Sequence, residues 1–543
     1  GASVEDVTLN AAAGDVTVGQ IGAAAVEIND VTITGTTINL GGNINTDDDG
    51  GAVGDVDLNG AVVLTNNVEI NTSAGNGTVD LSSTLNGAQT FAISSGSGAI
   101  AIQGVTGGTT ALTSLTINAA GTGTIEVTNI GAGAAGVTGA TAIGNAATTT
   151  LTLDGTVYNT DGTQTYTATA AGAGNNISLT AGADVTFTSS ADAITFGTAN
   201  ILLGNGSDLV VTTGSGAGNI GVVAITGTSV EDVTLSAGTG NVTVGVIGAA
   251  AAQINDVTLS GTTINLGGNI NTDNDGTDLG DVDINGAVAL AADVTIDTSA
   301  GDGTVNLSST VDNARNFDIA SGAGAVVITG GIGLTTALTT LDINNAAGAA
   351  TILLSADIGD TTVGVTGATR IGNANTATLT LGGDNFRTTG AQTYTAAAGN
   401  NINLSSGAAT TFTTANTAVA FGTGTVVLAN TTDLVVNSTG GDISVVAIKG
   451  FSVEDVTLNA VGGDVTVGAI GAVDGEINDV TITGATINLG GNINTENSGG
   501  AGTGGDVDIN GNVILTAAVT IDTTDSAVGN FDGTFDISGT VDG

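Results

Sequence analysis

The amino-acid sequence predicts an all-β fold: an elongated parallel β-helix (β-solenoid) built of short strands in stacked coils, with no significant helix. Three observations predict this fold class. A long internal repeat runs through the 543 residues, apolar residues alternate with polar ones in runs of three to five residues, and proline is absent. We take these observations in turn and then ask what function they favour.

The repeat defines the organisation of the chain. The phrase SVEDVTLNAAAGDVTVGQIGAA begins at Ser3, and close variants of it begin at Ser229 and Ser452. This spacing divides one continuous solenoid into copies 1–228 and 229–451 and a partial third copy, 452–543. Because the third copy stops partway, we expect the sequence to be a segment of a longer array. At roughly 20 residues per coil, a full copy would hold about 11 coils.

Paired β-forming residues, separated by one residue, indicate very short strands. Gly, Asn and Asp separate the runs, which is typical of strands joined by tight turns. No stretch has the 3.6-residue period of a helix. The first such pairs are Val7/Leu9, Val16/Val18, Val26/Ile28, Val31/Ile33 and Ile38/Leu40.

The absence of proline distinguishes stacked coils from other all-β folds. A sandwich favours longer strands and aromatic core residues, whereas only 2% of this chain is aromatic. In a parallel β-helix nearly every backbone N–H of a coil bonds to the next coil, and proline would break that ladder. Glycine and Asn take the corners that need left-handed dihedral angles.

Composition excludes several classes of function. The chain has 51 acidic residues, four basic residues and neither His nor Cys, for a net charge of −47. Catalytic triads with histidine, thiol nucleophiles and structural zinc sites are therefore excluded. Nucleic-acid binding is excluded as well, because it depends on Lys and Arg. There is no apolar run long enough to span a membrane as a helix, and no initiator Met or signal peptide.

Two phrases resemble the β-strand repeats of filamentous-haemagglutinin-like giant bacterial surface proteins. They are GGTTALTSLTINAAGTGTI from Gly107 with DGTQTYTATAAG from Asp161, and their second-copy forms from Gly333 and Thr389. The resemblance implies an extracellular protein of the bacterial cell surface, of adhesin or fibre type, that is exported unfolded. This chain lacks that family's amino-terminal secretion domain, so the resemblance leaves the export route open.

An acidic loop after each GGNINT phrase predicts a calcium site. Oxygen ligands at alternate positions followed by glycine are typical of calcium-binding loops. The match is incomplete, because no bidentate Glu follows and the third copy is degenerate. The alternative is a solvated acidic loop that bulges from the coils. The candidate Ca²⁺ ligands are Asn45, Asp47, Asp49, Asp55 and Asp57 in the first copy, and Asn271, Asp273, Asp275, Asp278, Asp281 and Asp283 in the second.

Other polar and aromatic residues are interpreted as structural. The acid pairs Glu5/Asp6, Glu231/Asp232 and Glu454/Asp455 recur at the same place in every copy, whereas an enzyme concentrates its site once. The Asn residues of the GGNIN phrases are expected to cap turns. The tyrosines Tyr158, Tyr166 and Tyr394 are expected to fill the core locally.

The sequence therefore predicts a structural protein without enzymatic activity. We expect an adhesin stalk, surface fibre or sheath filament that is stabilised by cations and self-associates head-to-tail or laterally. A host-surface or glycan target would be bound by a region outside this sequence, and we expect no nucleic-acid partner. The alternatives are a surface-layer lattice protein, an ice-binding module and a polysaccharide-degrading β-helix enzyme.

Overall fold

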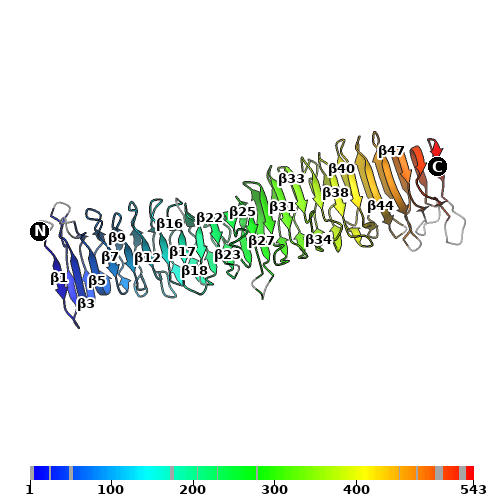
Figure 1. Ribbon diagram of the computed structural model, residues 1–543. Helices are drawn as coiled ribbons and strands as arrows, with labels where there is room; N and C mark the ends of the chain where they lie inside the picture. Colours follow the sequence, from blue (N-terminus) through cyan, green and yellow to red (C-terminus); the bar gives the residue numbers. More distant parts are fainter. Residues whose placement is uncertain are drawn as a thin grey trace. The chain divides into compact units, whose positions relative to one another are not determined.

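The structure is a computed structural model that describes residues 5–23, 26–47, 53–170, 176–204, 206–228, 230–274, 276, 279–451, 453–472, 475–495, 505–524 and 533–543. These residues contain strands and turns and no helix, and the ladders between the strands run parallel (Figure 1). The predicted β-solenoid of stacked coils is thereby confirmed. The chain forms two compact units, residues 1–265 and 266–543, which are described separately below.

Three parallel ladders form the walls of the first unit. The first ladder consists of β1 (Val7–Asn10), the starts of β3 (Val31–Leu40) and β5 (Val56–Leu64), β7 (Val79–Leu81), β10 (Ile100–Ile102), β12 (Ile125–Val127), β14 (Leu151–Leu153), β17 (Ile177–Leu179), β20 (Ile201–Leu203) and the end of β22 (Ile220–Thr226). The second consists of β2 (Val16–Val18), the ends of β3 and β5, β8 (Leu85–Asn86), β15 (Val157–Asn159), β18 (Val185–Thr188), β21 (Leu209–Thr212), β23 (Val233–Ser236) and β25 (Val257–Leu266). The third consists of β4 (Ile44–Asn45), β6 (Val68–Asn71), β9 (Thr90–Ser94), β11 (Ser114–Ile117), β13 (Thr141–Ile143), β16 (Gln164–Thr167), β19 (Ile194–Gly197), and the starts of β22 and β24 (Val242–Ile247). The end of β24 continues the first ladder from the end of β22.

The second unit is built in the same way. Its first ladder consists of β26 (Ile270–Asn271), β28 (Val294–Asp297), β31 (Asn316–Ala320), β33 (Thr340–Ile343), β35 (Thr369–Ile371), β38 (Gln392–Thr395), β41 (Val419–Gly422), the starts of β44 (Ile443–Lys449) and β46 (Val465–Ile470), the ends of β47 (Val480–Leu489) and β49 (Val507–Leu515), and β52 (Val541–Asp542). The second consists of the start of β27 (Val282–Leu290), β29 (Val305–Leu307), β32 (Val326–Ile328), β34 (Thr351–Leu354), β36 (Thr378–Leu381), β39 (Asn401–Leu404), β42 (Thr425–Leu428), the ends of β44 and β46, β48 (Ile493–Asn494) and β50 (Ile521–Asp522). The third consists of the end of β27, β30 (Val311–Asp312), β37 (Asn385–Arg387), β40 (Thr410–Thr414), β43 (Leu434–Ser438), β45 (Val456–Ala460), the starts of β47 and β49, and β51 (Phe535–Ile537).

Alternation along each strand places the apolar residues inside the coils. In β3, Val31 and Ile33 are fully buried, whereas Thr32 and Thr34 between them are partly exposed. Each buried Val, Leu or Ile contributes roughly 1.5–3 kcal/mol relative to an exposed one. Because like side chains stack on successive rungs, a core of small residues is continuous along each ladder.

The coils are larger than the sequence suggested. Val7 pairs with Val31, so one coil takes about 24 residues and not roughly 20. Nine steps from rung to rung along the first ladder lead from Val7 to Ile225, and Val233, the counterpart of Val7 in the second copy, then lies in the second ladder. A copy therefore fills nine turns and one face, and the expectation of about 11 coils was wrong.

The second unit repeats this displacement. Nine steps from rung to rung along the second ladder lead from Val282 to Ile493, and Val507, the counterpart of Val282, lies in the third. Each segment of the repeat thus moves to the next face in the next copy. The three faces must therefore accept the same side chains, which explains why all three are built from the same short Val-x-Leu and Val-x-Ile phrases.

A cluster of four aromatic side chains lies in the core of each full copy. Tyr158 stacks on Phe187 with ring centroids 4.7 Å apart, and Tyr166 stacks on Phe196 at 5.3 Å. Phe386, Tyr394, Phe412 and Phe421 repeat this cluster in the second unit. The prediction that the tyrosines are core residues is confirmed, because all three are fully buried.

Candidate functional site

The two predicted calcium loops and their degenerate counterpart in the third copy are joined to the coils in the same way. In each, a buried Thr hydroxyl donates a hydrogen bond to a glycine carbonyl across the base of the insertion: Thr46 to Gly54 at 2.5 Å, Thr272 to Gly280 at 2.5 Å, and Thr495 to Gly505 at 2.7 Å. This bond joins the two ends of the insertion, and we call its Thr and Gly residues the neck. The candidate ligands Asp49, Asp275 and Asp278 lie outside the described residues.

The other candidate ligands are distributed around these necks. Asn45 and Asn271 lie in β4 and β26, and Asp47 and Asp273 follow directly after the neck threonines. Asp55 and Asp281 lie immediately before β5 and β27, while Asp57 and Asp283 lie within these strands. Among the described residues, no group of three or more acidic side chains is arranged to hold a metal ion. Calcium binding therefore stays a prediction.

Aspartates that precede a strand bond from coil to coil, and we call these stacked residues the turn-aspartate ladder. Asp30 Oδ1 accepts the backbone N–H of Asp55 at 2.8 Å, and Asp55 Oδ1 accepts that of Thr78 at 2.6 Å. The carboxylate oxygen of one coil thereby fixes the residue that immediately precedes the strand on the next coil. The same contact joins Asp208 to Asp232, Asp232 to Asp256, Asp433 to Asp455, Asp455 to Asp479, Asp479 to Asp506, Asp506 to Thr534, and Asp281 to Thr304.

Stacking the carboxylates changes their acidity. Burial raises the pKa of Asp479, and the neighbouring carboxylates of Asp455 and Asp506 raise it further, although the N–H of Asp506 opposes them. Burial likewise raises the pKa of Asp57, together with the charges of Asp80 and then of Asp55. The carboxylates of neighbouring coils therefore repel one another, and the chain has only four basic residues to offset this repulsion.

In the acid pairs of the second and third copies, the glutamate is buried and the aspartate is not, whereas Glu5 and Asp6 of the first copy are both exposed. Glu454 is fully buried and accepts N–H groups from Phe451 at 2.6 Å, from Val453 at 3.3 Å, and from Thr431 of the preceding coil at 2.9 Å. Asp455 belongs to the turn-aspartate ladder. One residue of the pair therefore lies inside the coil and the other at its corner, which is an arrangement suited to joining coils.

Glu231 repeats the buried contact at the start of the second copy. It is fully buried and accepts the N–H and the hydroxyl of Thr228 at 2.6 and 2.8 Å. Glu231 and Glu454 each accept the N–H of the residue three positions before them, and this bond closes the turn at the start of a copy.

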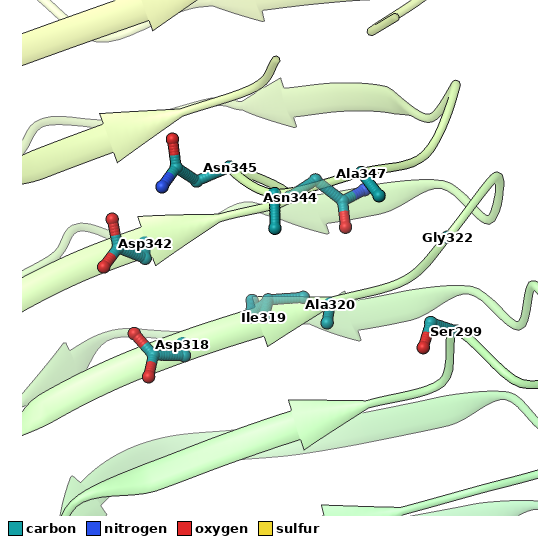
Figure 2. A pocket seen from close by; sticks show the side chains of 10 residues that line it. Ser299, Asp318, Ile319, Ala320, Gly322, Asp342, Asn344, Asn345 and Ala347 are labelled. Carbon is teal, nitrogen blue, oxygen red and sulfur yellow. The ribbon is translucent and has the colours of Figure 1, made fainter.

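A groove of about 370 Å³ crosses the outer face of β31 and β33. Figure 2 shows Asp318 and Asp342 on neighbouring strands at one end of it, with Asn344 and Asn345 further along. Arg370, on the next rung of the ladder, donates to Asp342 at 3.2 Å. Burial raises the pKa of Asp318, and the charge of Asp342 raises it further.

These charges belong to the second copy alone of the two full copies. The same rungs of the first copy carry Ala92, Thr116 and Ala142 in place of Asp318, Asp342 and Arg370. The groove offers carboxylates, amides and a guanidinium to a polar ligand. Neither the groove nor the ion pair was predicted from the sequence. A signal existed, because comparison of the two full copies shows a charged residue in the second copy at each of these three positions and an uncharged one in the first.

The turn-aspartate ladder was also missed, although a sequence signal existed. Asp stands directly before the first aliphatic residue of a strand again and again, as in Asp30-Val31, Asp55-Val56 and Asp479-Val480. The turn-capping role expected for the GGNIN asparagines is confirmed for one position of each copy. Asn43, Asn269 and Asn492 each accept a backbone N–H of the next coil at 2.9 Å.

The described residues include no helix long and apolar enough to cross a bilayer. Comparison of the chain with protein-family models, with curated proteins and with solved structures finds no match.

Proposed function

We propose that this chain is a structural β-solenoid of an extracellular fibre, in the form of an adhesin stalk, a surface fibre or a sheath filament, and that divalent cations stabilise it. Self-association, head-to-tail or lateral, would build the fibre. The resemblance to filamentous-haemagglutinin-like proteins is the basis for placing it at a bacterial cell surface.

The turn-aspartate ladder is the observation that carries this proposal. Its carboxylates hold successive coils together, as Asp479 does for Asp506 at 2.8 Å, and the same carboxylates repel one another. One ion pair, Asp342 with Arg370, is present among the described residues. A divalent cation that lowers this repulsion would stiffen the coils, and it would bridge neighbouring chains.

Electron microscopy with and without calcium tests the proposal. We expect filaments or bundles in calcium, and their dispersal by a chelator at equal ionic strength. Planar arrays would favour a surface-layer lattice protein and overturn the fibre assignment. Release of new sugar ends from acidic polysaccharides would overturn it in favour of an enzyme.

A matched pair of variants tests the predicted calcium loops. In Asp281→Asn the amide oxygen can still accept the N–H of Thr304, while the charge beside the neck is lost. The control is Asp302→Asn, because Asn76 already occupies that place in the first copy and accepts the same kind of bond. We expect Asp281→Asn to reduce the rise in melting temperature produced by calcium, and the control to leave it unchanged.

A further inference from the structure

We propose that the groove on the outer face of β31 and β33 binds a primary ammonium group on a short aliphatic chain, the group that ends a lysine side chain or a free diamine. The carboxylate of Asp318 accepts hydrogen bonds from the ammonium, and small residues further along the groove pack against the carbon chain. The inference goes beyond the proposed fibre, because it assigns a ligand site to the second unit.

The acidic end of the groove has one negative charge without a counter-charge. Arg370 donates two hydrogen bonds to Asp342, at 3.2 Å each. Among the described residues, none donates a hydrogen bond to the carboxylate of Asp318 on the neighbouring strand. Burial raises the pKa of Asp318, the charges of Asp342 and then of Asp293 raise it further, and the charge of Arg370 opposes them. A cation supplied by a ligand is therefore stabilised at Asp318.

The guanidinium of Arg370 favours an ammonium over a metal ion at this place. Calcium takes about six to eight oxygen ligands, whereas the groove offers two carboxylates, and that of Asp342 is already paired. Arg370 also repels a doubly charged ion more strongly than a singly charged one. An ammonium carries one charge and three N–H donors, so Asp318 and the exposed amide oxygen of Asn345 can both accept from it.

The other end of the groove suits the carbon chain. Ala320, Ala346 and Ala347 line it, and Figure 2 shows Ala320 and Ala347 away from the two carboxylates. Asn344 is buried there, and its amide is engaged with the N–H and the hydroxyl of Ser321 at 2.7 and 2.8 Å. The groove therefore presents an apolar surface next to an acidic one, and its volume of about 370 Å³ is typical of a site for a small ligand.

Comparison of the two full copies shows that both ends of the groove are specific to the second copy. Ala92 and Ser94 stand in the first copy where Asp318 and Ala320 stand in the second. The second copy is thus more acidic at one end of this surface and more apolar at the other. An alkylammonium ligand requires both changes, whereas the architecture of the coils requires neither, since the first copy folds without them.

The turn beside the groove differs between the copies as well. Ile352 follows Ile343 by nine positions, whereas Ile125 follows Ile117 by eight, and the two turns join equivalent rungs. The longer turn contains Asn345, which lines the groove. Changes in two strands and in one turn therefore converge on the same surface.

Calorimetric titration of the full chain tests the inference. The probes are Nα-acetyl-lysine methylamide, which presents a lysine side chain with neutral ends, and the free diamine cadaverine. In about 0.15 M salt, which screens charges more than about 8 Å apart, we expect saturable binding of one probe per chain, and the tighter probe identifies the source of the ammonium. Acetylation of the lysine probe at Nζ removes its charge, so this form should bind at least about tenfold more weakly.

A matched pair of variants locates the site. Asp318→Asn should weaken binding at least about tenfold, and the fold should tolerate it because the first copy has Ala92 at this place. The control is Asp312→Asn, which removes one charge from the same unit. Asn86 occupies that place in the first copy and accepts the same kind of backbone N–H, so the control should leave binding unchanged.

A third variant and hydrogen exchange test the role of the neighbouring groups. Arg370→Gln removes the competing cation, so it should tighten binding of the lysine probe by roughly two- to fivefold. Exchange of the backbone amides of residues 344–347 should slow when the probe is bound.

Four results would overturn the inference. They are absence of saturable binding, equal binding of the acetylated probe, equal losses in Asp318→Asn and Asp312→Asn, and weaker binding in Arg370→Gln. Displacement of the lysine probe by an equal concentration of calcium would assign the groove to a metal ion and would overturn it too.

Discussion

Arg370 donates from a single guanidinium nitrogen, Nη1, to both carboxylate oxygens of Asp342, at 3.2 Å each, across neighbouring rungs of β33 and β35. The arginine side chain is 46% exposed. An exposed pair of this kind contributes little to stability, because water and salt screen it. The pair also lies beside Asp318. The charge of Asp342 raises the pKa of Asp318, and the charge of Arg370 lowers it, so removing Arg370 would leave two neighbouring carboxylates without a cation.

We expect Arg370→Gln to lower the stability of the second unit only slightly. The pair is worth roughly 0.2–1 kcal/mol, and the loss should disappear in about 1 M salt. Hydrogen exchange of the amides of Thr340–Ile343 at low and high salt measures the effect. A loss that persists at high salt would mean that Arg370 acts through packing and not through its charge.

A second prediction concerns pH. The pKa values of Asp57, Asp208, Asp318 and Asp479 are raised above 3.8, first by burial. A folded-state pKa above the unfolded value means that the folded chain binds protons more readily. The associated stability is therefore present at low pH and is lost as the pH rises through the raised pKa. At low salt, the melting temperature should therefore fall as the pH is raised above 3.8, the ordinary value of these carboxyls.

The repeat contains a control for this pH effect. Asp57 faces Asp80 on the next rung, whereas its counterpart Asp283 faces Asn306. Asp57→Asn should raise the melting temperature at pH 7.5 more than Asp283→Asn does, because only the former removes repulsion across a rung. Equal effects of the two substitutions would show that repulsion between Asp57 and Asp80 is not the cause.

Much of this architecture follows from local patterns. Val-x-Leu pairs and missing proline predict short strands in uninterrupted ladders. Each residue's own side chain determines whether it can point into the core and whether its backbone N–H can bond to the next coil. The coil length could not be predicted in this way, since it depends on where β3 turns from one face to the next. The one-face displacement between Val7 and Val233 depends on the same corners.

The candidate site was less predictable for a physical reason. An acidic side chain before a strand has the same sequence signature whether it binds calcium or caps the next coil. For Asp55 the structure shows the capping bond, which its Oδ1 accepts from the N–H of Thr78, and calcium binding stays a prediction. Contacts between Asp318, Asp342 and Arg370 join residues more than twenty positions apart, and only the register of the coils brings them together.

The buried Glu454 yields a third prediction. In Glu454→Gln, an amide N–H₂ replaces one of two acceptor oxygens beside the donors of Thr431 and Phe451. Leaving a buried donor without an acceptor costs about 1–3 kcal/mol. Amide exchange from Leu434 to Val456 should therefore accelerate markedly. The control Glu126→Gln, at an exposed position in β12, should change nothing.

A fourth prediction compares the two aromatic clusters. The hydroxyl of Tyr158 donates to the carbonyl of Val127 at 2.9 Å and accepts the N–H of Gly155 at 3.0 Å. In the second copy Phe386 occupies this place, and the N–H of Gly382 bonds to the carbonyl of Leu354 at 2.7 Å. Tyr158→Phe should cost about 1–3 kcal/mol, because two buried groups lose their partner.

The reverse exchange is the control for that prediction. Phe386→Tyr would place a hydroxyl where the carbonyl of Leu354 is already satisfied, so it should destabilise the second unit instead of improving it. Denaturation monitored by hydrogen exchange in each cluster measures both changes. Stabilisation by Phe386→Tyr would contradict this account of the backbone bond.

The displacement of the repeat by one face gives the last prediction. Thr234 lies opposite Val210 in the second ladder. Thr234 is the counterpart of Thr8 in the second copy. If a copy filled nine whole turns, this counterpart would instead pair with Leu202 in the first ladder.

The chain contains no cysteine, so a pair introduced as Val210→Cys with Thr234→Cys can be joined by a short bifunctional reagent without competing reactions. We expect rapid cross-linking of this pair and little cross-linking of Leu202→Cys with Thr234→Cys, because neighbouring rungs lie about 4.8 Å apart and the two faces do not. Mass spectrometry of the cleaved product identifies the joined peptides, and preferential joining at Leu202 would mean that the repeat keeps each segment on one face.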